Sequence, residues 1–556
     1  MLKTATRITT RTARELARFR VVFSFLIPFV IVTFIPLSAF ASGTLLSLAS
    51  SQQEEKAIAL VVSGETDQAE SDGTTPLMYA AHYGLSDLAL ALLEAGANPN
   101  LTNDYGASAI GEAAFINDNR ILSLLLEFGA DPNLTNNEGE TPLMVVARAG
   151  NIEGATLLLE HGAEINAQER WGGQTALMWA AAQQQPEMLS LLIKHNANVN
   201  LHGFSRLWER RITSEPRPKD MNKGGFSALH YAARQGCIEC IDILASADAD
   251  LDASDPDRVT PLNLALINFH FDTAAALIEA GADLNKWDLF GRTPLYNAID
   301  LNTVPFGGRA DIPSLDNHSG FDIAKMLLER GANPNLQLKM APPFRNAVFD
   351  RGSDKVLTTG ATPLLVAARI GDNEAAKLLL EHGAYVDLPN AYGQTPLLVA
   401  AGVDYPTAPT RGRFKTEQTS IETIQLLLNG GANINSISGD PSLRPNGNDI
   451  PRPDRNEQMH PANRGPDVVE GKTALHGAAR NGWNQVAQYL IDQGIQQQVV
   501  DLSGRTPLDY AMGLYPPAYN DIQASPIDET VNLLSEACKA DDNCSLNVGI
   551  ASKASF

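Results

Sequence analysis

Cys237 and Cys240 form a Cys-x-x-Cys pair, a spacing found in redox and metal-binding motifs. A redox pair of this kind follows the strand of a βαβ unit, whereas this one lies where a helix is expected to begin. No His follows Cys240, so the pair is not a haem-attachment motif. We therefore predict two packing or disulfide-linked cysteines, whose oxidation state the sequence leaves open.

The remaining chemistry-bearing residues form no catalytic pattern. The ten histidines are scattered without metal-ligand spacing, and the chain contains neither a phosphate-binding P-loop motif nor a Gly-x-Ser-x-Gly motif. Asp131-Pro132-Asn133 before Gly139 is similar to a calcium loop, but its glycine stands at the wrong position. We predict no catalytic residue, no metal site and no cofactor, and we expect that the protein is not an enzyme.

What the sequence does contain is a repeat. The motif Thr-Pro-Leu or a close variant starts at residues 75, 108, 141, 175, 227, 260, 293, 362, 395, 473 and 506. The copies are 33 or 34 residues apart, except for three steps of 52, 69 and 78 residues that must carry insertions. A fixed period of this length predicts a solenoid, which offers an extended concave surface rather than a closed pocket.

One unit shows how the residues produce the structure. Thr141 can cap a helix whose first turn accepts Pro142, because the missing N–H of proline has no partner there. A second helix is expected from Ile152 to Glu160, and Gly162 lies where it must end in a left-handed conformation. This period and tetrad resemble the ankyrin repeat over residues 72–538, and the resemblance implies an all-α solenoid of helix-turn-helix units with β-hairpin fingers.

The resemblance also predicts how the rest of the chain is divided. About eleven repeats follow a degenerate N-terminal capping repeat at 42–71, and a C-terminal tail covers 539–556. The capping repeat is expected to contain a helix pair within residues 44–64, and residues 527–537 a last second helix. We place insertions near 202–224, 302–320, 336–359, 402–418 and 439–470.

Residues 1–41 are unlike the repeats. Five arginines precede an uncharged apolar run from Val21 to Leu37, and Ala39-Phe40-Ala41 is a small-x-small cleavage pattern. This favours a secretory signal peptide cut between Ala41 and Ser42. An uncleaved inner-membrane anchor and a mitochondrial presequence are the alternatives, and only the anchor would attach the protein to a membrane. With the basic flank in the cytoplasm, we expect a periplasmic or secreted array.

Charge and the remaining cysteines bear on partners and compartment. The net charge is −22, and without residues 1–41 it is −27, which disfavours nucleic-acid binding. Cys538 and Cys544 flank five residues just after the last expected helix. In an oxidising compartment we expect them to pair and to clamp the C-terminal cap.

Candidate binding residues lie on three surfaces. Aromatic residues precede the turn glycine at four hairpin tips: Tyr105, Trp171, Phe290 and Tyr392. The ends of the first helices, which face the concave side in the ankyrin family, offer His82, Tyr83, Arg148, Arg234 and Arg369. The insertions hold 18 basic and 15 acidic residues, against 18 and 48 in the rest of the chain after residue 41, and include Trp208, Arg210 and Arg211. Trp, Tyr and Arg are the residue types that dominate binding energy at interfaces.

Together these features predict a protein–protein interaction scaffold outside the cytoplasm. The insertions and the N-terminal signal are similar to those of secreted ankyrin proteins of Gram-negative bacteria. We expect an unidentified protein partner that contacts the concave face, the hairpin tips and the inserted loops. The alternatives are an accessory or protective subunit of an exported enzyme such as an oxidoreductase, and a toxin or immunity protein.

Overall fold

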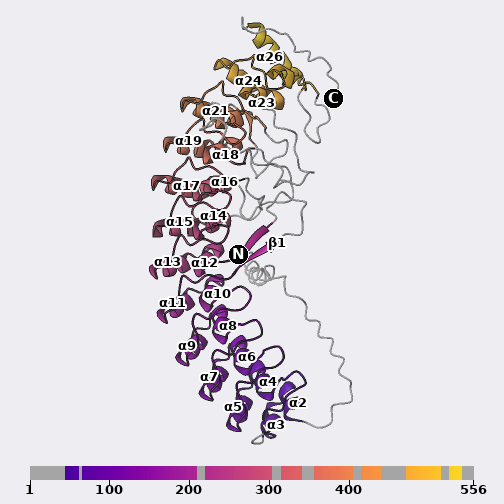
Figure 1. Cartoon of the computed structure of the whole chain (residues 1–556), viewed down its shortest axis with the longest axis vertical. Coiled ribbons are helices and arrows are strands. Elements are labelled where there is room, and N and C mark those ends of the chain that lie inside the picture. Colours follow the sequence, from indigo (N-terminus) through magenta and orange to yellow (C-terminus); the bar gives the residue numbers. More distant parts are fainter. Residues whose placement is uncertain are drawn as a thin grey trace, which may run out of the picture.

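The computed structural model describes residues 44–61, 65–209, 220–302, 315–340, 356–404, 415–439, 471–514 and 525–540. Regular structure in these residues is almost entirely helical, and the helices pair one after another into a single curved array (Figure 1). The all-α solenoid predicted from the repeat is confirmed. Each stretch between residues 210 and 470 that lies outside the described residues falls within a segment expected to be an insertion.

Each repeat begins with a short first helix. Its N-cap is the Thr or Ser of the motif; the Thr141 side chain, for example, accepts a hydrogen bond from the Met144 amide. The first helices are α4 (Pro76–Tyr83), α6 (Ala109–Ile116), α8 (Pro142–Ala149), α10 (Ala176–Ala182), α12 (Ala228–Gln235), α14 (Pro261–Ile267), α16 (Pro294–Leu301), α18 (Pro363–Ile370), α20 (Pro396–Ala400), α23 (Ala474–Asn481) and α25 (Pro507–Ala511).

A second helix runs back antiparallel to each first helix. In the third repeat it ends before Gly162. The φ of Gly162 is 89°, so this residue has the left-handed conformation predicted from the sequence. The second helices are α5 (Ser86–Glu94), α7 (Asn119–Glu127), α9 (Ile152–Glu160), α11 (Pro186–Lys194), α13 (Ile238–Ser246), α15 (Phe271–Ala280), α17 (Gly320–Glu329), α19 (Asn373–Glu381), α21 (Glu417–Asn429), α24 (Asn484–Asp492) and α26 (Asp528–Ala540).

Two further elements flank or interrupt this pattern. The short helices α2 (Leu45–Ser50) and α3 (Glu54–Ile58) pack on the first repeat in the segment where a degenerate helix pair was expected. Strands β1 (Ser205–Glu209) and β2 (Asp220–Gly224) pair antiparallel, with Ser205 opposite Gly224 and Glu209 opposite Asp220. This ribbon lies in the first insertion, where no strand was expected from the sequence.

The core is one continuous layer between the two rows of helices. In the third repeat Leu143, Ala147 and Leu158 are almost completely buried, and the corresponding Leu and Ala positions of the other repeats join the same cluster. Each first helix contacts the first helices before and after it as well as its own second helix. Each repeat therefore covers its apolar surface only with the help of its neighbours.

Hydrogen bonds between hairpin tips tie the repeats together on one edge. The Asp104 amide donates to Asp72 O at 2.8 Å, and the Arg170 amide donates to Glu138 O at 2.9 Å. The same link recurs in the C-terminal half, where the Ala391 amide donates to Thr359 O at 2.8 Å. We call these hairpins the fingers. Outside β1 and β2, the fingers in the described residues are tight turns rather than extended strands.

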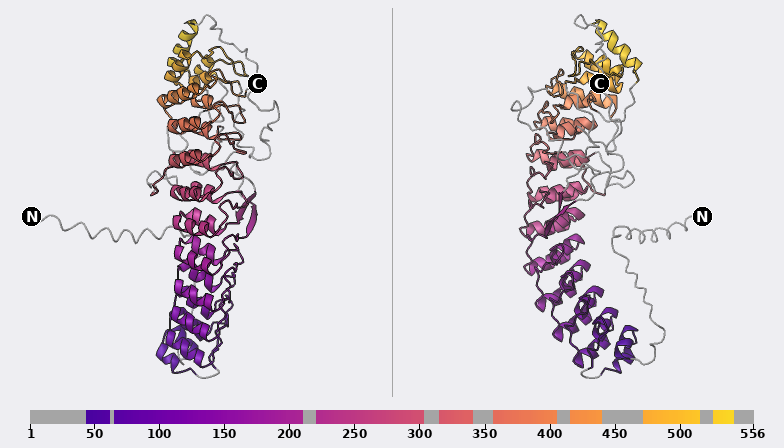
Figure 2. Two further views of the ribbon diagram at one scale, coloured as in Figure 1. Left: turned by 90° about the vertical axis from the view of Figure 1, so that its left-hand side faces the viewer. Right: turned by 45° about the vertical axis from the view of Figure 1, so that its right-hand side comes forward.

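The array is curved, with the first helices on the inner side and the second helices on the outer side (Figures 1 and 2). The β1–β2 ribbon projects on the inner side beside α12 (Figure 1). We call the surface formed by the first helices and the fingers the concave face.

Two histidines of the repeat motif act as buried links between repeats. His230 Nδ1 accepts from the Ser227 amide at 3.2 Å, and His476 Nδ1 accepts from the Thr473 amide at 3.0 Å. Each Nε2 donates to a carbonyl of the next repeat, that of Val259 or Arg505, so each ring is neutral. Burial lowers the pKa of both histidines from 6.5 to about 4.

These histidines should make the array acid-sensitive. Between pH 6.5 and 4 the unfolded chain binds protons at both positions and the folded chain does not, so the free energy of unfolding falls as the pH falls. The full effect is on the order of 3 kcal/mol per histidine. In urea titrations from pH 7 to 4, we expect the double variant H230Q/H476Q to be less stable at pH 7 and to show a flatter pH dependence. The exposed His161→Gln serves as control, and an unchanged slope in the double variant would contradict the assignment.

Candidate partner-binding surface

Each first helix contributes two positions to the concave face. They are the fifth and the eighth residue, counted with the capping Thr or Ser as the first. In the first repeat these are Tyr79 and His82, and Tyr83 follows. His82 Nδ1 lies 2.8 Å from Glu112 Oε2, and Glu112 is the fifth position of the second repeat. Side chains of neighbouring first helices thus meet across the repeats, because both positions point away from the core.

Tyrosines occupy the N-terminal end of this face. The rings of Tyr79 and Tyr83 stack with their centroids 6.2 Å apart. The Tyr79 hydroxyl donates to Glu70 Oε1 at 3.1 Å, so a finger residue and a helix residue share one surface. Burial and the nearby Glu70 carboxylate raise the pKa of Tyr79 to about 12, which keeps it a neutral hydrogen-bond donor.

Arginines predicted from the sequence lie over aromatic rings. The Arg148 guanidinium is 4.8 Å from the centroid of Trp179, which is the fifth position of the next repeat. The Arg234 guanidinium is 5.0 Å from the Tyr231 ring and 5.8 Å from the Phe226 ring. Such cation–π contacts hold long side chains in place at a surface. Arg148 is exposed and Arg234 is half-buried, so both are accessible.

The prediction for Arg369 is wrong. Arg369 occupies the same repeat position as Arg148, yet only 4% of its surface is exposed, so it cannot present itself to a partner. The fifth position shows the same contrast, since Val145 is half-buried whereas Val366 is fully buried. The concave positions of the seventh and eighth repeats are therefore buried in the folded chain, whereas Val145, Arg148 and Arg234 keep part of their surface accessible.

Buried charged side chains are also concentrated in the C-terminal half of the array. Ten Asp, Glu, Lys and Arg residues are buried among the described residues, and only Glu169 precedes residue 288. Buried Lys415, at the end of an insertion, donates through Nζ to Ala368 O and Val399 O at 3.1 and 3.0 Å. Burial and, secondarily, the nearby Arg369 hold the Lys415 pKa well below its usual range. Lys415 thereby ties two first helices together, a contact that no local sequence pattern predicts.

The four aromatic fingertips divide into two pairs. Tyr105 and Trp171 are 65% and 64% exposed, as expected for anchors. Phe290 and Tyr392 are half-buried. Phe290 lies 5.3 Å from the Arg292 guanidinium, and its carbonyl accepts from the Lys339 amide, so this finger is covered by later residues of the chain. Phe290 and Tyr392 are therefore less exposed than Tyr105 and Trp171, and their role as partner-binding anchors stays a prediction.

The inserted ribbon extends the concave face near the fourth repeat. The Phe204 amide donates to Gly172 O, and the Arg206 guanidinium lies 5.4 Å from the Trp171 ring. Trp208 lies in β1, but its side chain is not among the described ones, and Arg210 and Arg211 lie outside the described residues. The ribbon thus places a cation beside an exposed fingertip.

Sequence reasoning missed two surface aromatics. Phe115, at the eighth position of the second repeat, is 61% exposed, and Trp179 lies half-buried under Arg148. Both could have been found by counting from the capping residues Ser108 and Thr175, because the eighth and fifth positions of every first helix face the same way.

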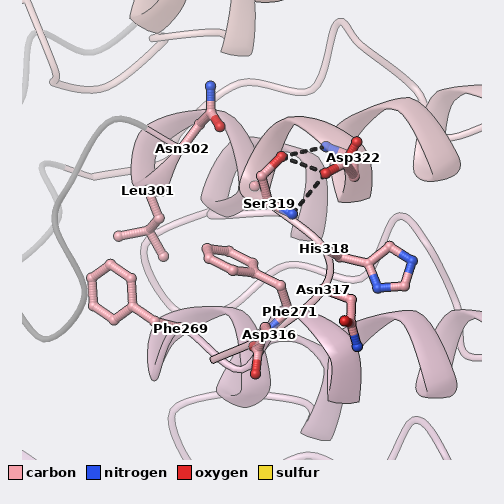
Figure 3. Close-up of a pocket in the computed structure, with 10 residues that line it drawn as sticks. Phe269, Phe271, Leu301, Asn302, Asp316, Asn317, His318, Ser319 and Asp322 are labelled. Atoms are coloured by element: carbon pink, nitrogen blue, oxygen red, sulfur yellow. Dashed lines mark hydrogen bonds between the residues drawn. The ribbon is translucent and has the colours of Figure 1, made fainter. Parts of the chain in front are cut away.

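A cavity of about 290 Å³ lies between the sixth and seventh repeats. Phe269, Phe271 and Leu301 line one part of it, and a polar segment that includes His318 and Asp322 lines the other (Figure 3). The polar segment is already bonded within the chain.

His318 Nδ1 is 2.6 Å from Asp272 Oδ1, and Asp316 Oδ2 accepts from the Phe271 amide at 2.5 Å. Hydrogen bonds of this polar segment therefore join the sixth and seventh repeats at the cavity.

The structure tests the prediction for Cys237 and Cys240, but not the predicted cleavage site or the full pairing of Cys538. Cys237 and Cys240 form a disulfide at the start of α13. Cys538 is also disulfide-bonded, but Cys544 lies outside the described residues, so their pairing stays a prediction. Ala41 and Ser42 lie outside them as well. Among the residues that the structure describes, no helix combines the length and apolarity needed to cross a membrane, and no three His, Cys, Asp or Glu side chains are grouped as metal ligands.

Arg148 and Arg369 allow a matched test of the two halves. We expect Arg369→Ala to lower the free energy of unfolding by about 2 kcal/mol or more, because truncating a buried side chain leaves a cavity in the packed structure. Arg148→Ala should cost no more than about 1 kcal/mol, the worth of an exposed cation–π contact. Urea unfolding of both variants measures the difference, and equal costs would show that the two halves are not covered differently.

The comparisons with known proteins agree with this architecture. Family models described as "Ankyrin repeats (3 copies)" match residues 110–202, 229–338, 317–438 and 417–516, and one described as "Ankyrin repeats (many copies)" matches residues 63–112.

Among similar curated proteins, the mouse B-cell lymphoma 3 protein homolog is 31% identical over 293 residues, which is 52% of this chain and 48% of that protein. The chicken nuclear factor NF-kappa-B p105 subunit is 31% identical over 218 residues, covering 35% of this chain and 20% of that protein. Human ankyrin repeat and SOCS box protein 16 is 28% identical over 245 residues, 40% of this chain and 54% of that protein. The chain thus matches about half or less of the length of these relatives. Because the repeat models cover most of its length, this chain belongs to the ankyrin-repeat family.

Proposed function

We propose that this protein is an interaction scaffold outside the cytoplasm that binds a protein partner through the concave face of its first five repeats. Ankyrin repeats are protein–protein interaction modules, and the chain consists largely of them. The observation that supports the proposal most directly is the position of its exposed aromatic residues. Tyr83, Phe115, Tyr105 and Trp171 all lie on this part of the concave face and are all exposed.

Large exposed aromatic side chains favour binding because they bury much area at little entropic cost. The same face carries Arg148 and Arg234, fixed over aromatic rings before any partner arrives. Preorganised side chains lose less conformational entropy on association than flexible ones. Fingers joined by backbone hydrogen bonds hold the fingertips in register, so the whole face can act as one rigid surface.

Two observations support export. The Cys237–Cys240 disulfide and the disulfide at Cys538 are features typical of oxidising compartments. The basic segment, apolar run and Ala39-Phe40-Ala41 pattern of the N-terminus fit a secretory signal. The periplasm or the medium is therefore the proposed location.

The binding surface is tested with matched aromatic variants. We expect Tyr105→Ala and Trp171→Ala each to weaken binding of the partner that copurifies with the full-length protein by about tenfold or more. The free energy of unfolding should change by less than about 0.5 kcal/mol, because both side chains are exposed. Titration calorimetry measures the affinity.

Tyr385→Ala is the control, because Tyr385 is 66% exposed but follows the second helix α19, away from the fingertips. Equal affinities for wild type, Tyr105→Ala and Trp171→Ala would exclude the fingertips from the interface.

Export is tested by the mature N-terminus. We expect N-terminal sequencing of protein recovered from the periplasm or medium to begin at Ser42, because the cleavage pattern ends at Ala41. Ala39→Asp should block processing, since that pattern requires a small residue at this place. An intact Met1 on membrane-bound protein would identify an anchor instead, and intact protein in the cytoplasm would refute export.

A further inference from the structure

Charge is unevenly distributed along the exposed part of the concave face. Residues 65–147, which form the first two repeats and the third finger, contain thirteen acidic residues and one basic residue, Arg120. Arg120 lies on the outer helix α7, where it pairs with Asp87 at 2.7 Å. On the fingers of this stretch, Glu70, Asp104 and Glu138 are exposed. The N-terminal end of the concave face is therefore anionic.

The next part of the same face is cationic. Arg148, Arg170, Arg206 and Arg234 follow one another from the third to the fifth repeat, and each is exposed or half-buried. The only acidic finger residue between Arg148 and the ribbon, Glu169, is buried and accepts from three amides of its own finger. The Glu169 carboxylate is thus bonded within its own finger. The four arginines therefore give the concave face a positive charge from the third to the fifth repeat.

Exposed aromatic side chains lie along both parts. Tyr83 and Phe115 come from the first helices, and Tyr105 and Trp171 from the fingers. Two aromatic rings of this face already hold guanidinium groups of the chain itself, Trp179 that of Arg148 and Trp171 that of Arg206. The face can therefore take apolar groups as well as charges from a ligand.

The seventh and eighth repeats interrupt this surface. At the concave positions of the seventh and eighth repeats, Asn297, Asp300, Val366 and Arg369 are all buried. A ligand that follows the concave face from the first repeat would therefore meet accessible side chains as far as the fifth repeat and buried ones at the seventh and eighth.

We propose that this surface binds an extended segment of a partner protein with segregated charges. Its cationic end lies over the first three repeats, its centre is apolar, and its anionic end meets Arg148, Arg170, Arg206 and Arg234. Neighbouring packed helices are about 8–10 Å apart, so the four steps between the first helices of five repeats span about 40 Å. An extended chain covers about 3.3 Å per residue, so a segment of about 12 residues reaches across them. This inference rests on the proposed function and specifies the chemistry of its partner.

The experiment uses a random library of 12-residue peptides displayed on phage and selected on the immobilised full-length protein. We expect the enriched peptides to carry Lys or Arg in one half and Asp or Glu in the other. For one such peptide made synthetically, D104K/E138K and R148E/R234E should each weaken binding at least tenfold in fluorescence anisotropy. The control K377E/E381K reverses two exposed charges on the outer helix α19 and should leave the affinity unchanged.

A charge-exchange experiment separates a binding role from damage to the fold. A second synthetic peptide, with the basic residues of its cationic end replaced by Glu, should bind D104K/E138K better than it binds the wild-type protein. A variant that merely unfolded would bind neither peptide.

Three results would overturn the inference: no enrichment, enriched peptides without segregated charges, or affinities that the concave variants do not change. If peptides without segregated charges still lose affinity in Y105A and W171A, the proposed function stands and only the chemistry of the partner is wrong. Analytical ultracentrifugation of the full-length protein should show a monomer. A dimer that R148E/R234E dissociates would overturn the inference by assigning the surface to a second copy of the chain.

Discussion

Each repeat can bury its apolar surface only against its two neighbours, and the rest of the structure depends on this constraint. It requires the capping Thr or Ser, the Leu or Ile two residues later and the small or apolar residues at the sixth and seventh positions of each first helix to stay similar from repeat to repeat, because nearly all of them lie in the contacts. The fifth and eighth residues of each first helix and the fingertips lie outside these contacts. Differences between repeats that concern binding therefore have to be found at those positions.

The local features of the fold could be predicted because they depend on residues close in sequence. The cap of α8 is a bond between Thr141 and the amide three residues later, and Gly162 stops α9 through its own backbone conformation. Burial on the concave face is different. Arg148 and Arg369 occupy the same position in nearly identical helices, Pro-Leu-Met-Val-Val-Ala-Arg-Ala and Pro-Leu-Leu-Val-Ala-Ala-Arg-Ile, yet one is exposed and the other is buried. No local pattern separates them, since Lys415, 46 residues after Arg369, is among the groups that surround it.

The buried charged side chains of the C-terminal half affect its stability. Lys472 Nζ lies 2.7 Å from Asp404 Oδ1, and both side chains are almost completely buried. Removing such charges from water costs about as much as their attraction returns, so the pair adds little net stability compared with apolar packing. Breaking it, however, is strongly unfavourable. Several charged side chains of the C-terminal half are thus held in contacts within the chain, whereas Tyr83, Phe115 and Arg148 of the N-terminal half stay at the surface.

The fingers show how a side chain can serve binding without being needed for the fold. In the second repeat, Asn103 Oδ1 accepts from the amides of Tyr105 and Ala107 at 3.0 and 2.9 Å. In the seventh repeat, Asp288 Oδ1 accepts from the corresponding amides of Phe290 and Arg292 at the same distances. The residue two places before the tip therefore sets the shape of the finger in both cases, and the tip side chain takes no part in it. Phe290 is covered because Arg292, held at 2.6 Å from Asp288 Oδ2, lies over its ring, whereas Tyr105 is followed at that place by Ala107. A single residue two places after the tip thus helps to decide whether a fingertip aromatic stays at the surface, where a partner can reach it.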